Sequence, residues 1–280
     1  MRGTALETEL EMFQLPDMPQ VVYKNPPLAL VICQVRYNSI LNVANTGFVA
    51  PFQNAIQNLY PQVGVTPAQE IQFSVIPGEM GVLQGAPSIQ WQFSDLDDNW
   101  KIVLTPSYFS IETRVYEHFD AFIDRLKEAL KALVEYIRPT AVLRIGLRYV
   151  NEIRSDTMSW PDIIRHELLG PLVVPELISD AIQASAFQQM QLRYADNQGA
   201  NINHGLFSTG SAVRPRGGIQ PSDQPFYLLD FDVYREFSPS KVSSMNADLI
   251  CHHVSRYHRV VSQLFYWSIT EKYLATLEVK

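Results

Sequence analysis

The chain has 280 residues, of which 46% are apolar, so it can bury a substantial core, and an intrinsically disordered protein is excluded. Its formal net charge of −7 argues against bulk electrostatic binding to nucleic acid or anionic membranes, although a local basic patch is still allowed. No segment approaches the ~20 apolar residues of a membrane span, and residues 1–20 lack the apolar core of a secretory signal, so we expect a cytoplasmic protein.

The first half of the chain is predicted to contain both strands and helices. Residues 1–25 are polar and are expected to form an extended lead-in that ends at Asn25-Pro26-Pro27. Alternating and helical apolar periods, separated by turn signals, then predict a strand, a helix, four strands of an antiparallel meander and a long helix. These elements are expected at 28–40, 45–60, 69–76, 88–94, 100–105, 108–116 and 118–137.

The clearest strand lies at the middle of the chain, over residues 141–153. Leu147 and Tyr149 belong to an apolar face that repeats every second residue, whereas Arg144, Gly146 and Arg148 fall on the opposite face. This alternation is typical of a strand with one face against the core. The strand therefore presents two arginines on its other face.

The second half repeats this order. Ser159 and Asp162 form a capping-box pattern at the start of a helix expected over 159–169. Three strands and a second long helix follow, expected at 181–194, 201–208, 226–235 and 246–266. The loop 209–224 between the last two strands is rich in Gly, Pro and Ser and exceeds the usual loop length.

The two halves align as an internal duplication, with repeats at 26–140 and 141–280 and the loop 209–224 inserted in the second. An offset of 112 residues pairs Arg36-Tyr37 with Arg148-Tyr149, and the final helices match at an offset of 128. The order strand, helix, antiparallel meander, long helix predicts an α+β fold with a curved antiparallel sheet and the long helices packed on one face. A single continuous and irregular α+β domain is the alternative.

The duplicated order resembles the fold of the TATA-box-binding protein, in which two such halves form one curved antiparallel sheet. The intercalating phenylalanine pairs of that protein have no counterpart here. A helix-grip arrangement of the START or Bet v 1 type, with a long helix held against a curled sheet around a ligand, is the nearest rival.

Short motifs in the first 155 residues are similar to those of a sporadically distributed, highly divergent and largely uncharacterised family of bacterial proteins. The motifs are Asn25-Pro26-Pro27-Leu28, Trp91-x-Phe93-Ser94 with Trp100, Tyr116-x-x-Phe119, and Arg144-x-Gly146-Leu147-Arg148-Tyr149-x-Asn151. The resemblance implies no known activity. The patchy distribution of such a family implies an association with mobile-element or defence genes.

Arginines are the candidate ligand-binding or partner-binding residues. Arg144 and Arg148 share a strand face and could clamp an anion by paired, charge-assisted hydrogen bonds, or could instead pair across strands with Glu112 or Glu152. The remaining candidates are two arginines that precede tyrosines at strand ends and two in the inserted loop: Arg36, Arg193, Arg214 and Arg216.

No pattern of residues predicts a catalytic, metal or cofactor site. His252, His253 and His258 lack the spacing of helical metal ligands, and Asp95–Asn99 is expected to be an acidic hairpin turn because it lacks the glycine and the glutamate of a calcium loop. His204 lacks a nucleophile pattern and an orienting acid. Cys33 and Cys251 are expected to be small buried side chains.

These observations favour a non-enzymatic binding module that engages a protein partner or a small ligand on the sheet face through the arginines. The alternative is nucleic-acid binding through a locally basic concave sheet and the arm at 209–224. A hydrolase or transferase would need a pocket that gathers His204 or the histidines of 252–258 with carboxylates. A homodimer formed through a free sheet edge or an aromatic surface is a further option.

Overall fold

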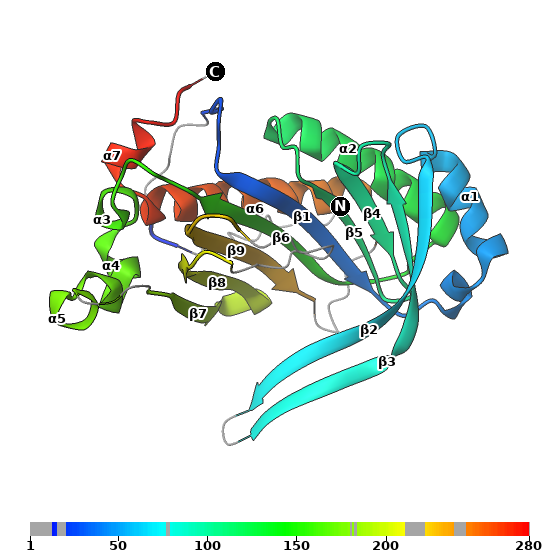
Figure 1. Cartoon of the computed structure of the whole chain (residues 1–280). Helices are drawn as coiled ribbons and strands as arrows, with labels where there is room; N and C mark the ends of the chain where they lie inside the picture. The colour runs from blue at the N-terminus through cyan, green and yellow to red at the C-terminus, as the bar shows by residue number, and fades with distance from the viewer. Residues whose placement is uncertain are drawn as a thin grey trace, which may run out of the picture. The chain divides into compact units, whose positions relative to one another are not determined.

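The computed structural model describes residues 13–15, 21–76, 79–179, 181, 184–210, 222–237 and 245–279, with side chains for all of these except 68–76 and 79–88. Nine strands form one sheet in the order β2-β3-β4-β5-β1-β6-β9-β8-β7 (Figure 1). The strands pair antiparallel and helices pack on the sheet, so the predicted α+β class is confirmed.

The strands lie close to their predicted places, apart from the two longest. Their bounds are β1 (Leu28–Tyr37), β2 (Gln62–Ile76), β3 (Glu79–Ser94), β4 (Trp100–Leu104), β5 (Tyr108–Thr113), β6 (Val142–Ile153), β7 (Ala186–Arg193), β8 (Gln198–Phe207) and β9 (Phe226–Glu236). The helices are α1 (Thr46–Ile56), α2 (Phe119–Ala132), α3 (Trp160–Ile163), α4 (His166–Leu169), α5 (Pro175–Ile178), α6 (Ala247–Ser268) and α7 (Glu271–Leu274). Short turns of other helix types complete the chain: η1 (Leu41–Ala44), η2 (Leu133–Ile137), η3 (Gly170–Val173) and η4 (Ala195–Asn197).

The chain divides into two compact units, which we call unit 1 and unit 2. Unit 1 comprises residues 1–27, 151–235 and 257–280, and unit 2 comprises 28–150 and 236–256. Strand β6 and helix α6 each contribute to both units. Along the chain, the order of strand, helices, meander and long helix occurs twice, first as β1 to α2 and then as β6 to α6. The duplication of sequence at 26–140 and 141–280 stays a prediction.

In unit 2, helices α1 and α2 cover one face of the strands. Phe52 of α1 contacts Phe93 of β3, with ring centroids 5.6 Å apart, and Phe122 of α2 stacks on Trp100 of β4 at 5.8 Å. Strand register places these contacts on the face that also carries Cys33 of β1. The apolar face predicted from alternation is therefore the face that the helices bury.

Strands β2 and β3 begin well before their predicted starts at residues 69 and 88, and both end at the predicted residue. The first of these strands was predicted to start at residue 69, yet Gly64 and Pro67 already lie in β2, where Pro67 pairs in register with Ile89. Because β2 stands at the end of the sheet, a proline that lacks a backbone N–H need not break a hydrogen bond to a second neighbour. The predicted start was wrong because the position of a strand at the edge of the sheet is not visible in its local sequence.

The helix predicted over 159–169 is broken into α3 and α4. Ile164 adopts extended backbone angles and bridges to Ile269 of the tail, and Arg165 N–H donates to the Ser268 carbonyl at 2.9 Å. The Ser159 hydroxyl donates to Asp162 Oδ2 at 2.9 Å instead of capping the helix backbone. Tertiary pairing with the tail thus overrides the local helical period.

The described part of the lead-in pairs with the end of the chain in unit 1. Tyr23 bridges to Val279, and Lys24 N–H donates to the Glu278 carbonyl at 2.7 Å. The Lys24 ammonium also lies 2.8 Å from the Glu278 carboxylate. Both side chains of this ion pair are largely exposed, so it contributes little to stability.

Candidate binding surfaces

The predicted arginines of β1 and β6 lie in unit 2 on the face opposite the helices. Arg36 stands opposite Tyr108 of β5 in register, on the other side of β1 from buried Val35 and Tyr37. Arg144 and Arg148 likewise alternate with buried residues of β6 and are half-buried. All three engage neighbouring groups, so none is a free charge.

Gly146 gives Arg144 its place on the strand. A Cβ atom at residue 146 would lie 2.7 Å from Nη1 and 3.1 Å from Cζ of Arg144, so the guanidinium lies over the glycine backbone. A larger residue would force the arginine away from the strand. The Arg-x-Gly spacing in the sequence therefore sets where this charge is presented.

The two carboxylates considered as partners for the arginines lie in different settings. Glu112 is almost fully buried and stands in register with Ile32 of β1 and Lys101 of β4, on the arginine-bearing face of unit 2. Glu152 of unit 1 forms an ion pair with Arg154, with Nη2 and Oε2 2.8 Å apart. Arg154 in turn lies over the Phe226 ring at 5.1 Å.

A second surface, which we call the Asn201 face, is formed in unit 1 by one side of β7, β8 and β9. Asn201 Nδ2 donates to Asp232 Oδ2 at 3.1 Å, and Asn203 Nδ2 donates to Asp230 Oδ2 at 3.0 Å. Register places exposed glutamines of β7 beside both asparagines, namely Gln191 opposite Asn201 and Gln189 opposite Asn203.

Aromatic rings continue the Asn201 face toward the edge of the sheet. Phe226 and Phe207 are stacked with centroids 5.3 Å apart, and Phe187 meets Phe207 edge-on at 5.8 Å. Phe226 is buried, whereas Phe187 is 55% exposed. Sequence reasoning missed this surface, although its signal is the alternation of amides at 189 and 191 on β7 and at 201 and 203 on β8.

The remaining predicted arginines lie in unit 1 or outside the described residues. Arg193 lies in unit 1 at the end of β7, where it is exposed and stands opposite Gly199 of β8. Its neighbour Tyr194 contacts Phe13 of the lead-in at 5.5 Å. Arg214 and Arg216 lie outside the described residues, as does most of the inserted loop.

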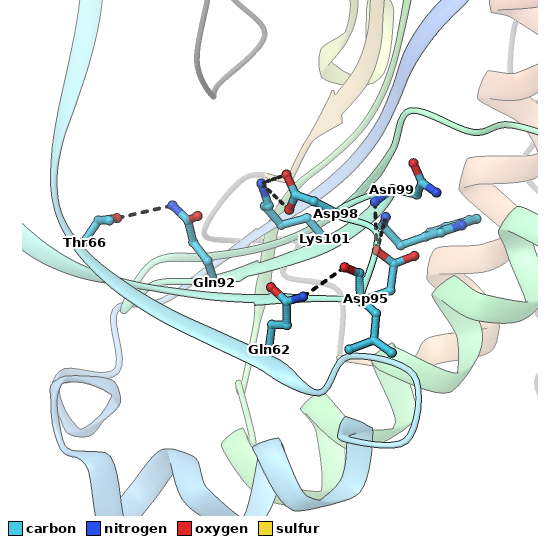
Figure 2. Close-up of polar contacts among 9 residues, drawn as sticks. Gln62, Thr66, Gln92, Asp95, Asp98, Asn99 and Lys101 are labelled. Carbon is cyan, nitrogen blue, oxygen red and sulfur yellow. Dashed lines mark hydrogen bonds and ion pairs between the residues drawn. The ribbon is translucent and has the colours of Figure 1, made fainter.

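A pocket of about 240 Å³ lies in unit 2 beside the turn between β3 and β4. Asp95 Oδ1 organises this turn by accepting the N–H groups of Asn99 and Trp100 at 2.8 and 3.1 Å (Figure 2). Lys101 and Asp98 form an ion pair at 3.1 Å across the turn. The prediction of an acidic hairpin turn at 95–99 is therefore confirmed.

Trp100 lines this pocket, which we call the Trp100 pocket, and helix α2 supplies the opposite wall. The Arg125 guanidinium lies over the Trp100 ring, 4.4 Å from its centroid. His118 Nδ1 accepts the N–H of Ala121 at 3.1 Å, so a neutral His118 ring carries its proton on Nε2. The pocket thus combines aromatic rings with a guanidinium and an imidazole.

Two tyrosine hydroxyls meet behind this pocket. Tyr149 donates to the Tyr116 hydroxyl at 3.1 Å. Burial raises the pKa of Tyr116 to about 12 and raises that of Tyr149 well above its usual value. Both groups therefore stay protonated at neutral pH and serve as hydrogen-bond partners, not as bases.

The cysteines and histidines have structural settings. Cys33 and Cys251 are buried free thiols, as predicted, and burial raises the pKa of each. Within the described residues, no group of three or more His, Cys, Asp or Glu side chains could hold a metal ion. His204 meets the Tyr227 hydroxyl at 2.9 Å, and that hydroxyl donates to the Leu168 carbonyl at 3.0 Å. His204 thus links β8 to helix α4 through the Tyr227 hydroxyl.

Stability should fall in mild acid because of His204. Burial lowers the pKa of His204 below its usual 6.5, so the unfolded chain takes up a proton that the folded chain resists. The free energy of unfolding should decrease as pH falls below ~6.5, by at most about 1.4 kcal/mol per pH unit for this one proton. Urea unfolding of wild type and His204→Gln between pH 7.5 and 5.5 measures the difference. His252→Gln, at an exposed position, is the control, and an equal change of slope in both variants would contradict the assignment.

No protein-family model matches the chain, and no curated protein matches it. None of the helices in the described residues has the length and apolar character needed to cross a membrane.

Proposed function

We propose that the protein is a non-enzymatic binding module that acts in the cytoplasm and engages a protein partner on the face of its sheet. The observation that supports this proposal most strongly is the Asn201 face, which joins an exposed aromatic ring to rows of amides. Phe187 is 55% exposed at one end, and Gln189 and Gln191 are exposed beside it. Aromatic anchors beside groups that both donate and accept hydrogen bonds are typical of protein interfaces.

The charges of this face favour a protein over a nucleic acid. Asp230 and Asp232 project on the same side of β9 as the asparagines that they bind. Carboxylates on a surface repel phosphates, whereas nucleic-acid sites are lined by Lys and Arg. In unit 2, the face that carries Arg36 also carries the buried carboxylate of Glu112. Nucleic-acid binding is therefore the alternative function, and the experiment below distinguishes it from protein binding.

A photo-reactive phenylalanine analogue at position 187 tests the proposal. In lysate of the protein's own host, this residue should cross-link to one protein partner, and Phe187→Ser should weaken binding to the identified partner about 10-fold because it removes the aromatic anchor. The same analogue at Leu177 of α5, which is 66% exposed in the same unit, is the control. Equal labelling from both positions would contradict the proposal. A salt-sensitive shift with DNA or RNA that is lost in an Arg144→Ala, Arg148→Ala double variant would favour the alternative function.

A further inference from the structure

Strand β7 ends the sheet without the features that usually keep sheet edges apart. Edge strands are commonly interrupted by proline, lysine or a bulge, which prevent pairing with another chain. The other edge, β2, has Pro67 and an irregular register at Gln69/Ile71. β7 has the sequence AFQQMQLR, with no proline, lysine or carboxylate, and pairs with β8 in unbroken register.

Exposure is concentrated on this strand. From Phe187 to Gln191 every residue is exposed, on both faces of β7, and Phe187 and Met190 are 55% and 41% exposed. The only charge is Arg193, at the end of the strand. A stretch without charge, with apolar and amide side chains on both faces, suits backbone pairing with a further strand.

We propose that the edge of β7 pairs antiparallel with β7 of a second copy of this chain, about a two-fold axis through Met190. A two-fold axis perpendicular to the sheet keeps each face continuous across the junction, so residues of equal parity must oppose one another. Met190 then faces its own counterpart, and Gln189 faces Gln191 of the other copy. Gln188 faces Leu192, and Phe187 faces Arg193.

This register is self-complementary. On the Asn201 face, Gln189 and Gln191 form amide pairs, and Arg193 of one copy can lie against the exposed ring of Phe187 in the other. The two arginines stand six positions apart, about 20 Å along the strand, so like charges are not brought together. A two-fold axis through Gln189 would instead oppose Phe187 to Gln191 and Met190 to Gln188, which places both exposed apolar side chains against amides. In the proposed register only the half-buried Leu192 meets an amide.

Cysteine cross-linking tests the pairing and its register. Met190→Cys should form a disulfide-linked dimer rapidly under mild oxidation, because residues that face each other across a two-fold axis meet the Cα separation of a disulfide. The native thiols at Cys33 and Cys251 are buried and should not compete. Gln189→Cys tests the competing register, and Leu177→Cys is the exposed control. Faster linkage of Gln189→Cys than of Met190→Cys, or linkage of both no faster than the control, would overturn the proposal.

Charged substitutions at Met190 test the same pairing without a covalent cross-link. Wild type should sediment as a dimer at micromolar concentration, and Met190→Lys and Met190→Glu should each weaken dimerisation at least 10-fold because like charges meet at the axis. An equimolar mixture of the two variants should restore a dimer. A monomeric wild type, or a mixture that stays monomeric, would overturn self-pairing.

Self-pairing and the proposed partner binding both involve Phe187, Gln189 and Gln191, but the two proposals can be tested separately. Pairing also requires the backbone edge of β7 and the residue at its axis, which Met190→Lys changes, whereas partner binding requires the side chains of the Asn201 face. Monomeric Met190→Lys that carries the photo-reactive residue at 187 should still cross-link to the protein partner. Loss of cross-linking with an intact dimer would count against the binding proposal alone.

Discussion

Gly205→Ala should destabilise the protein by about 3 kcal/mol, because the substitution forces two strand backbones apart. A Cβ atom at residue 205 would lie 2.0 Å from the Ala186 carbonyl oxygen and 2.8 Å from the Cα of Phe187. Both atoms belong to the backbone of β7, so no side-chain rotation can relieve the clash. Urea unfolding measures the change in stability. Relative to wild type, the substitution should increase the rate of amide hydrogen exchange more in β7 than in β1.

Gly64→Ala is the matched control for this substitution. Gly64 also lies within a strand, but a Cβ atom there would meet only the Cβ of Gln92, at 4.0 Å. Because alanine reduces the conformational freedom of the unfolded chain, this variant should be unchanged or more stable by about 0.5 kcal/mol. Similar destabilisation by both substitutions would show that the close approach of β7 to Gly205 is wrong. If it is right, Gly205→Ala should also weaken partner cross-linking and dimerisation, since both use β7.

Faces of a single strand could be predicted from the sequence, whereas the requirement for a glycine at residue 205 could not. The period of two in Leu147 and Tyr149 against Arg144 and Arg148 predicted β6 and both of its faces, because alternation is a property of one strand. The requirement for glycine at 205 depends on the strand that lies opposite it. That register joins residues almost twenty positions apart and is not contained in a local pattern.

Among the candidate surfaces, features set by neighbouring residues were predicted, and features set by contacts between distant segments were missed. The acidic turn at Asp95 could be predicted from five consecutive residues, and the shared face of Arg144 and Arg148 from their spacing. The Asn201 face was missed because it needs the pairing of Asn203 with Asp230 across strands. The break after Ile163 was missed because its cause lies in the tail, more than one hundred residues later.

Trp100→Ala should destabilise the protein by about 3–5 kcal/mol, the usual range for truncation of a large aromatic residue in a core. Trp100 is 9% exposed and stacks on Phe122, which is fully buried. The loss would leave Phe122 in contact with Tyr116 but without the ring that stacks on it, and would open the Trp100 pocket toward the core. Urea unfolding measures the effect, and fluorescence at fixed urea can follow it through Trp91, which stays buried in the same unit.

A double-mutant cycle separates the guanidinium from the rest of this effect. Arg125→Met keeps an unbranched side chain over the ring but removes the cation, so alone it should destabilise the protein by about 1 kcal/mol. In the Trp100→Ala background the same change should have almost no effect, because the ring that attracts the cation is already absent. An equal cost in both backgrounds would mean that Arg125 stabilises α2 by other contacts. A coupled result would instead show that the ring holds the guanidinium at the mouth of the pocket, oriented before any ligand or partner group arrives.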